Sequence, residues 1–563
     1  MKSRKRKRSG LRPLFGVLLL GALAFGAYRG YQVYGPSTGH VSEAELFGVS
    51  GERTAIMYNY ELQSAHALCR NGEAYFPVEW VRTILNKRFY WDVEEALLVY
   101  ALPDQIVKMP CDSAEEAENT SFFMEENKLW LSASLIQSYT DIRMEPFLDG
   151  EVKRIFVETW EEADTVAGAR GRTVLRSRPS RKGDIVAEIQ ENERLRYIPD
   201  HPNAATDTER WQRVMTADGR TGYVSLRKMF QTEELATENP FVAPEYTSLR
   251  MENDVLLGWH QVTTAEANQY IGKITEKAAG LNVVSPTWFS LRGNEGDYVS
   301  LASRSYVDAA HAKGLQVWAL LDNFDSSVTL GTALKRTSVR ERLIAGLMEE
   351  AERCGLDGIN IDFELLRKDA VKQYLQFMRE LSVACRTRGL YLSVDVPNPA
   401  SYNWHYDREE LGVFCDYVIN MGYDEHTSGD EMGSTASLGF FSDGIERSLK
   451  EVPKEKLVAG LPFYTRIWRQ EKGGALTSEA VTMRTAAEWI ETYQIPLSWD
   501  DSVGQYTGKR VTDNGSIQYI WVEDVRSLEL KINEIRKNGL AGTACWRLGQ
   551  EDEAVWALWE EYE

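Results

Sequence analysis

The sequence predicts an α/β chain in which residues 245–563 form a (β/α)8 TIM barrel, preceded by a small α+β repeat domain and a small β-barrel domain. The main observation is a series of apolar runs that alternate with amphipathic helical stretches, as expected of parallel strands and their crossover helices. These runs lie at 255–262, 281–291, 314–323, 356–364, 389–398, 414–426, 456–464 and 539–549. The longer interval at 465–538 predicts an insertion after the seventh strand.

Two segments upstream of the barrel have different patterns. In residues 44–165, the stretches that begin at Phe76 and Leu131 share an order of strand, amphipathic helix and two strands, at a spacing of about 55 residues. This internal repeat predicts the small α+β domain. Residues 168–230 contain short β-rich runs separated by Pro, Gly and Asn, which predict the small β-barrel.

The N-terminus combines basic and apolar residues. Residues 1–30 contain eight Lys or Arg and no acid, and an apolar run extends from about Leu14 to Tyr28. This order predicts a cytoplasmic tail and an uncleaved single-pass transmembrane anchor in the cell membrane, with the other domains outside the cytoplasm. Because the run is shorter than the ~20 residues of a full span, a cleaved signal peptide and a secreted protein remain the alternative.

Charge and motif content exclude several classes of function. The chain after residue 30 carries about −28, which is the total of −20 less the +8 of residues 1–30. Such an acidic body does not suit nucleic acid, and neither GxxxxGK[ST] nor a helix-opening GxGxxG is present to bind phosphate. No CxxC or HExxH occurs, so we expect no metal and no cofactor.

Six cysteines are too few for a disulfide scaffold. Cys69 and Cys111 share one predicted exported domain and are candidates for a pair. The other four adjoin apolar runs and are expected to be buried thiols: Cys354, Cys385, Cys415 and Cys545.

Polar residues gather at the ends of three predicted strands. In LDGINIDFE, residues 356–364, Asn360, Asp362 and Glu364 share one face of a strand and the large apolar residues share the other. Active sites of such barrels lie at the carboxyl ends of the strands. We therefore expect Glu364 at the rim, Asp362 one pleat below and Asn360 deeper. The sixth strand ends in NMGYD (420–424), and the eighth ends at Trp546.

These motifs carry a family resemblance over about residues 245–563. DGINIDFE resembles the DGxDxDxE strand of glycoside hydrolase family 18, which includes chitinases and N-acetylglucosaminidases; MGYD at 421–424 resembles its MxYD, and Trp546 its strand-eight tryptophan. SPTWFS and GLPFY, with DFE preceded by Asn, are similar to the branch of spore-cortex and peptidoglycan-lytic glucosaminidases.

The upstream segments also have resemblances. Residues 168–230, with VLRSRPS, WxxV and GRTGYV, resemble bacterial Src-homology-3 (SH3)-like domains, which often bind cell-wall peptides; a spacer without a ligand is the alternative. Residues 44–165 resemble the stalk-like domain named after the N-terminal region of copper amine oxidases, and the chain offers no copper ligand cluster.

The family resemblance implies a mechanism. Glu364 would be the general acid and then the general base. The 2-acetamido oxygen of the sugar would attack C1 in place of a second carboxylate. Asp362 would hold the acetamide N–H, Tyr423 its carbonyl, and Trp546 the apolar floor. Further predicted substrate-binding residues are Asp424, Met421, Asn360, Trp288 and Trp259, with Phe324 and Trp468 as candidate sugar platforms.

One position departs from the family pattern, because family chitinases mostly have Asp where this chain has Asn360. An amide cannot share a proton with Asp362 or repel it, so Asp362 should ionise more readily and alter the pH optimum.

The predicted function is a retaining N-acetylglucosaminidase of peptidoglycan in a Gram-positive bacterium. The alternatives are hydrolysis of chitin or chitooligosaccharides, a glycan-binding protein without activity, and an assembly or stalk protein. Endo or exo action depends on loop lengths and is left open.

Overall fold

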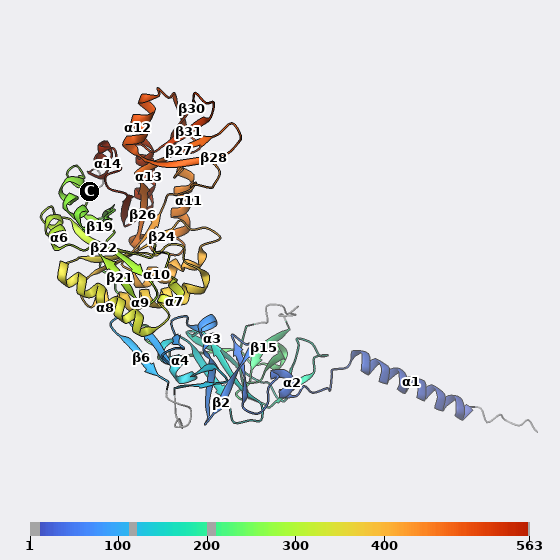
Figure 1. The fold of residues 1–563 in the computed structure, drawn as a ribbon. Coiled ribbons are helices and arrows are strands. Elements are labelled where there is room, and N and C mark those ends of the chain that lie inside the picture. Colours follow the sequence, from blue (N-terminus) through green and yellow to red (C-terminus); the bar gives the residue numbers. More distant parts are fainter. Residues whose placement is uncertain (1–11, 112–120, 200–209, 561–563) are drawn as a thin grey trace, which may run out of the picture. The chain divides into compact units, whose positions relative to one another are not determined.

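The computed structural model of the chain describes residues 12–111, 121–199 and 210–560. The basic residues of the predicted cytoplasmic tail before Arg12 lie outside the described residues. The chain divides into two compact units (Figure 1). Unit 1 comprises residues 1–87 and 111–243, and unit 2 comprises residues 88–110 and 244–563.

The described part of unit 1 begins with helix α1 (Arg12–Tyr34), which covers the predicted apolar run, and a short helix α2 (Glu43–Phe47). The predicted transmembrane segment is not found. Among the described residues, no helix combines the length and the apolarity that crossing a membrane requires.

The first sheet of unit 1 has seven described strands in the order β7-β8-β3-β2-β1-β10-β9. Their bounds are β1 (Arg53–Tyr58), β2 (Glu61–Arg70), β3 (Glu73–Pro77), β7 (Phe122–Glu125), β8 (Lys128–Ser132), β9 (Arg143–Phe147) and β10 (Lys153–Glu158). Two strands of this sheet are each followed by a short helix, and the repeat domain stays a prediction. A short helix α3 (Val78–Trp80), continued by η1 (Val81–Leu85), follows β3, and helix α4 (Ala133–Tyr139) follows β8.

The second sheet of unit 1 is antiparallel, with described strands in the order β13-β12-β16-β15-β14-β11-β17. Their bounds are β11 (Ala163–Gly168), β12 (Thr173–Arg176), β13 (Ile185–Ile189), β14 (Arg194–Tyr197), β15 (Trp211–Met215), β16 (Thr221–Ser225) and β17 (Glu233–Ala236). Leu175, Leu195, Val214 and Val224 form its fully buried core. The strands lie where short β-rich runs were predicted, and the SH3-like identity remains a prediction.

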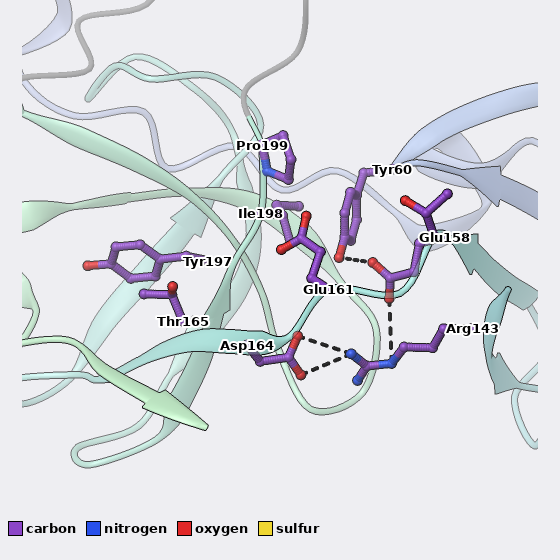
Figure 2. Close-up of a pocket in the computed structure, with 10 residues that line it drawn as sticks. Tyr60, Arg143, Glu158, Glu161, Asp164, Thr165, Tyr197, Ile198 and Pro199 are labelled. Carbon is purple, nitrogen blue, oxygen red and sulfur yellow. Dashed lines mark hydrogen bonds and ion pairs between the residues drawn. The ribbon is translucent and has the colours of Figure 1, made fainter. Parts of the chain in front are cut away.

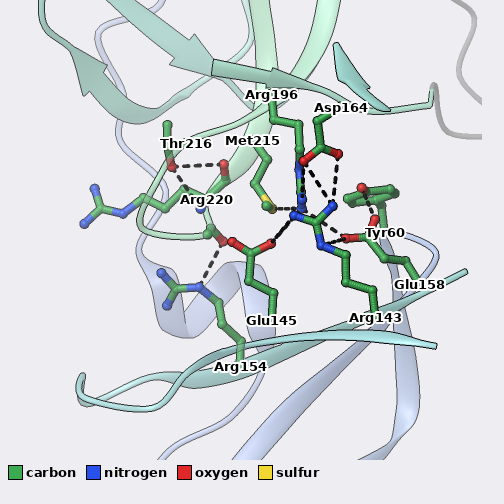
Figure 3. Close-up of polar contacts among 11 residues, drawn as sticks. Tyr60, Arg143, Glu145, Arg154, Glu158, Asp164, Arg196, Met215, Thr216 and Arg220 are labelled. Atoms are coloured by element: carbon green, nitrogen blue, oxygen red, sulfur yellow. Dashed lines mark hydrogen bonds and ion pairs between the residues drawn. The ribbon is translucent and has the colours of Figure 1, made fainter. Parts of the chain in front are cut away.

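A charged network links the two sheets of unit 1 (Figure 3). Arg196 of β14 donates to Glu145 of β9 at 2.8 Å and to Glu158 of β10 at 3.2 Å. Arg143 of β9 donates to both carboxylate oxygens of Asp164 of β11 at 3.0 Å. Arg196 and Glu158 are about one-tenth exposed and the other three side chains are partly buried, so removing one partner would leave an uncompensated charge between the two sheets.

Unit 2 contains the predicted barrel. Within residues 210–560, all described, eight parallel strands close into a ring in the order β18, β19, β22, β23, β24, β25, β26, β32 and back to β18. Their bounds are β18 (Val255–His260), β19 (Val283–Pro286), β22 (Gln316–Asp322), β23 (Gly358–Asp362), β24 (Tyr391–Pro397), β25 (Tyr417–Met421), β26 (Leu457–Pro462) and β32 (Gly542–Trp546). The fold prediction for this domain is confirmed.

Helices cover the outside of the ring: α6 (Arg304–His311), α8 (Thr337–Cys354), α9 (Val371–Arg386), α10 (Arg408–Phe414), α11 (Leu438–Ser448), α13 (Val525–Asn538) and α14 (Trp556–Glu560). Strand residues of one parity, such as Ile359, Ile361 and Val394, pack against these helices. Residues of the other parity, such as Trp318 and Leu320, fill the barrel interior. The strands are buried on both faces, which explains their continuous apolar runs.

The long interval between the seventh and eighth strands holds an insertion with five described antiparallel strands and helix α12 (Met483–Thr492), orange in Figure 1. The strands are β27 (Tyr464–Gln470), β28 (Leu476–Thr482), β29 (Leu497–Asp500), β30 (Gln505–Val511) and β31 (Ile517–Val522). It follows β26 directly, so Tyr464 of its first strand lies at the mouth of the barrel.

A three-stranded sheet from the predicted repeat domain belongs to unit 2: β4 (Tyr90–Asp92), β5 (Leu97–Ala101) and β6 (Ile106–Pro110). Asp92 accepts hydrogen bonds from the backbone N–H and the hydroxyl of Thr337, at 2.6 and 2.7 Å, where α8 begins. The guanidinium of Arg340 lies 4.5 Å from the ring centre of Tyr90. Such contacts between segments that are distant in sequence leave no periodic signal. The sequence therefore predicted one repeat domain over residues 44–165, whereas residues 88–110 belong to unit 2.

Replacing Asp92 with alanine is expected to lower the free energy of unfolding of unit 2 by about 1–2 kcal/mol, because α8 loses an acceptor for its first N–H group. Denaturant unfolding followed by tryptophan fluorescence measures this change. Asp92→Asn keeps one acceptor oxygen and should lose less. Glu94→Ala, which removes a half-exposed ion pair with Lys335, should stay within about 0.5 kcal/mol. An unchanged unfolding midpoint for Asp92→Ala would contradict the contact.

Candidate active site

Three carboxylic acids occupy one level of the barrel interior. Asp322 of β22 is the register partner of Asp362 of β23, and both are almost completely buried. Ile361 pairs with Val394, so Asp395 of β24 follows at the same level on the other side of Asp362. Because Val394 packs toward the helices, Asp395 faces the interior. Three adjacent strands therefore each contribute an acid to the carboxyl-terminal end of the ring.

Asn360 lies one pleat below these acids and uses its whole amide. Its Oδ1 accepts from Trp259 Nε1 and Ser285 Oγ, both at 3.1 Å. Its Nδ2 donates to Ser393 Oγ at 3.0 Å and to Asp395 Oδ1 at 2.9 Å. The side chain has no exposed surface. Asn360 therefore lies beneath the site and connects neighbouring strands by hydrogen bonds. It was predicted to bind the substrate, but it is too deeply buried to reach one.

Asp362 is a buried acid with one oxygen that has no partner in the described chain. Only 4% of it is exposed, and its Oδ1 is buried without a hydrogen-bond partner in the described chain. Burial, and then the neighbouring Asp395, raise the pKa of Asp362 well above its usual value. The expectation that Asp362 ionises more readily than it would beside an aspartate at position 360 stays a prediction, because this raised pKa is relative to the usual value of an aspartate.

Glu364 lies at the rim, two residues beyond Asp362, and the side chain of Asn323 holds its backbone by two hydrogen bonds. Asn323 Oδ1 accepts from Glu364 N at 3.0 Å, and Asn323 Nδ2 donates to Glu364 O at 3.0 Å. The next residue, Leu365, has a left-handed φ of 52°. Burial raises the pKa of Glu364, and the charges of Asp424 and Asp322 raise it further. A carboxyl with a raised pKa can stay protonated and act as an acid.

The sixth and eighth strands bring aromatic side chains to the same mouth. The ring of Trp259 lies edge-on to Tyr423 at 6.5 Å and to Trp546 at 5.9 Å. Burial raises the pKa of Tyr423, so its phenol remains a hydrogen-bond donor. Asp424 is exposed beside it and accepts a hydrogen bond from Tyr464 Oη at 2.6 Å. Gly422 is required here, since a Cβ would lie 2.6 Å from Phe441 of α11.

Two cavities meet at Glu364 and Leu365. The larger one, about 770 Å³, is lined by polar loop residues and by Phe324, Lys335 and Arg367. The other, about 660 Å³, is lined by Met421, Tyr423 and Asp424 and by the loop after β24, residues 397–406. Cavities of this size accommodate sugar units on both sides of the acid.

The remaining aromatic residues that were predicted to contact sugars differ in how deeply they are buried. Phe324 is 57% exposed and lines a cavity, so it is available to a ligand. Trp288 and Trp468 are each 1% exposed and donate to Asn268 Oδ1 and Gly433 O at 2.8 Å, which places both in the core. Trp259 is equally buried, and it supports Tyr423 and Trp546 from below.

Sequence reasoning missed Asp322, Asn323 and Asp395. Each was visible as a polar residue at the end of an apolar run, in LLDN and SVDVPN. The strand-end rule used for Glu364 would have found them, had it been applied to every strand.

Around the site, the described residues include no metal cluster and no disulfide. Within the described ranges, no group of three His, Cys, Asp or Glu is arranged to hold a metal ion. Cys354, Cys385, Cys415 and Cys545 are buried thiols, as predicted. Cys69 is also a thiol, so the suggested pair with Cys111 is not formed.

A separate cavity of about 220 Å³ lies in unit 1 (Figure 2). Glu158, Glu161 and Asp164 line it together with one guanidinium, that of Arg143, and with Tyr60 and residues 197–199. Arg143 is already paired with Asp164, and Tyr60 donates to Glu158. The lining is therefore acidic, and most of its polar groups bind one another.

Replacing Asn323 with alanine is expected to lower kcat by about 10- to 100-fold, because a shift of about 1 Å in a catalytic group has an effect of this size. The substitution removes both hydrogen bonds to the Glu364 backbone but leaves the carboxyl in place. Initial rates on a soluble N-acetylglucosamine oligomer measure the loss. Ser327→Ala, on the exposed part of the same loop, is the matched control. A kcat for Asn323→Ala equal to that of the control would contradict the clamp.

An acid at the rim of a (β/α)8 barrel, a carboxyl beneath it and aromatic side chains beside them are typical of a glycoside hydrolase. Residues 292–551 match the family described as Glycosyl hydrolases family 18. The barrel is a family 18 glycoside hydrolase domain of the chitinase-like type, and the protein is an enzyme.

Two curated relatives come from Bacillus subtilis (strain 168). The chain is 23% identical over 306 residues to the "Uncharacterized glycosylase YvbX", covering 52% of this chain and 88% of the relative. It is 28% identical over 264 residues to a "Cortical fragment-lytic enzyme", covering 45% of this chain and 61% of the relative. Among solved structures, the Bacillus cereus spore cortex-lytic enzyme SleL has a TM-score of 0.51 at 20% identity, over 60% of this chain and 79% of that one. This last likeness shows the fold.

Proposed function

We propose that the protein hydrolyses β-linked N-acetylglucosamine polymers with retention of configuration, by substrate-assisted catalysis, and that its substrate is peptidoglycan. The observation that carries the proposal is the buried Oδ1 of Asp362, which has no hydrogen-bond partner in the described chain and lies one pleat below Glu364. A buried acceptor without a partner is costly unless a ligand supplies the donor. The N–H of a 2-acetamido group is such a donor.

In the first step, Glu364 donates its proton to the glycosidic oxygen as the bond from that oxygen to C1 breaks. The acetamide oxygen forms the new bond to C1, which places positive charge on the acetamide. Asp362 accepts the acetamide N–H and stabilises this charge, while Tyr423 donates to the acetamide oxygen and orients it. Glu364, now a carboxylate, then removes a proton from the water that attacks C1, which restores the acetamide and the acid.

One observation favours a polymeric substrate, and another favours peptidoglycan among such polymers. The two cavities that meet at Glu364 provide room for sugars on both sides of the scissile bond, which suits cleavage within a chain. Relatives of the barrel are named as cortical fragment-lytic enzymes, and together with the resemblance to peptidoglycan-lytic glucosaminidases this supports peptidoglycan over chitin. Chitin or chitooligosaccharides are the second candidate, since other relatives are named as chitinases.

We also propose that the enzyme acts outside the cytoplasm, at the wall of a Gram-positive bacterium, as the basic and apolar N-terminus suggests. Binding of cell-wall peptides by residues 168–230 would hold it there. The acidic cavity of Figure 2 borders this segment at Tyr197 and Ile198 and would suit the free amine of a peptide stem.

The test is digestion of purified peptidoglycan, followed by reduction of the new ends and mass spectrometry of the fragments. The proposal expects N-acetylglucosamine at the new reducing ends. New N-acetylmuramic acid ends would contradict the bond assignment. Cleavage of chitohexaose with no action on peptidoglycan would favour the second candidate, and binding to either polymer without any cleavage would favour a glycan-binding protein.

A further inference from the structure

We propose that Asp395 is a positioning residue of the active site, which shares one proton with Asp362 and so lets Asp362 meet the substrate as an anion. The inference rests on the proposed role of Asp362 toward the acetamide. Neither the family motifs nor the strand that carries them includes Asp395, which comes from the neighbouring strand β24.

Asp362 and Asp395 lie at the same level on adjacent strands. Asp362 and Asp395 follow the paired residues Ile361 and Val394 on adjacent parallel strands, and both side chains face the barrel interior. They are 4% and 2% exposed. Neighbouring strands in a sheet lie about 4.8 Å apart, so two inward carboxyls at one level are close enough to interact directly.

The second support is the fixed orientation of Asn360. An indole N–H is only a donor, so the bond from Trp259 Nε1 identifies the oxygen of the Asn360 amide. Nδ2 must therefore be the atom that donates to Asp395 Oδ1. Asp395 Oδ1 therefore accepts a hydrogen bond from Asn360 and is not the oxygen that carries a proton.

The third support is the lack of a compensating cation. Within residues 210–560, no Lys, Arg or His forms an ion pair with either acid. The titratable groups that influence the pair are acids and phenols: Asp322, Glu364, Tyr374, Tyr406 and Tyr423. Two buried negative charges without a cation cannot both persist, so the pair retains a proton. Burial raises the pKa of Asp395 to about 8, so Asp395 can take up that proton from Asp362 at neutral pH.

The shared proton has a defined place in the reaction. In the free enzyme, the pair carries one proton and one negative charge. As positive charge develops on the acetamide, the O–H bond to Asp362 breaks and an O–H bond to Asp395 forms. Asp362 becomes the anion that accepts the acetamide N–H, and the total charge of the pair stays at −1. Asp395 thus acts on the substrate only through Asp362.

Asp395→Asn in the full chain tests this directly, because asparagine keeps an oxygen for Asn360 but cannot take up a proton. We expect kcat on chitohexaose to fall about 10- to 100-fold, with KM unchanged within about twofold. Infrared spectra provide a second readout. The parent should lose a protonated-carboxyl band between about pH 7 and about pH 9, on either side of the pKa of Asp395, and Asp395→Asn should lack this band.

Ser393→Ala is the matched control, since Ser393 also accepts from Asn360 Nδ2 but cannot ionise. If Asp395 served only to hold Asn360, the alanine variant would lose activity and Asp395→Asn would not. A parental kcat for Asp395→Asn, or an unchanged carboxyl band, would overturn the proposal. An inactive parent would refute the proposed function instead, and the infrared comparison would still decide the shared proton.

Discussion

Glu364→Gln is expected to reduce kcat by about 10²- to 10⁴-fold, the range that a general acid and base contributes. Glutamine has nearly the same shape but can neither give a proton to the glycosidic oxygen nor take one from water. The clamp by Asn323 holds only backbone atoms of residue 364, so the variant should keep the local structure. KM and the binding of chitohexaose, measured by tryptophan fluorescence, should change little.

The control is Glu352→Gln, which makes the same chemical change on the exposed face of α8, away from the mouth of the barrel. This variant should retain the parental kcat.

The pH dependence of the parent has a defined sign, because the acid form of Glu364 is the reactive one. Activity should fall as the pH rises through the pKa of Glu364, which burial has raised above its usual value. If Glu364→Gln retained more than a tenth of the parental kcat, Glu364 could not be the general acid.

Asp362→Asn is expected to lower kcat by about 10²- to 10³-fold, as does the loss of one group that stabilises charge in a transition state. The amide oxygen can still accept the acetamide N–H, but it carries no negative charge to stabilise the developing cation. The effect should therefore appear in kcat and leave KM almost unchanged.

The same variant should be more stable than the parent at neutral pH. The folded pKa of Asp362 is raised, so the unfolded state binds fewer protons between the two pKa values and stability falls as the pH rises through this window. Asparagine removes that penalty, and Tm at pH 7 should increase. The gain should shrink at a pH below the unfolded pKa of Asp, where both states are protonated. A lower Tm for Asp362→Asn at pH 7 would contradict the assigned burial of an unpaired acid.

Local sequence patterns predicted the regular strands and helices of the barrel. The alternation of apolar runs and helices located the eight barrel strands, since a parallel strand buried on both faces has a characteristic sequence. The parity of Asn360, Asp362 and Glu364 correctly assigned them to the interior face. The depth of each was also correct, because strand ends lie at the mouth of such barrels.

Features that depend on partners from other strands were not predictable in the same way. Trp288 is the core partner of Tyr306, and nothing in SPTWFS distinguishes that role from a sugar platform. Burial and then Asp395 on the neighbouring strand β24 raise the pKa of Asp362, and the pattern of residues 356–364 contains neither influence. The β4–β6 sheet belongs to unit 2 through contacts such as Asp92 with Thr337, which lie 245 residues apart in sequence.

The central claim is that the sugar's own acetamide attacks C1 beneath Glu364. The most direct test compares initial rates on two oligosaccharides that differ only at the sugar to be cleaved, with a 2-acetamido group in one and a 2-hydroxyl group in the other. We expect cleavage of the acetamido compound, with the first product in the β configuration, and no detectable cleavage of the hydroxyl compound. Equal rates on the two compounds would show that a protein carboxylate or water attacks C1, and would contradict the claim.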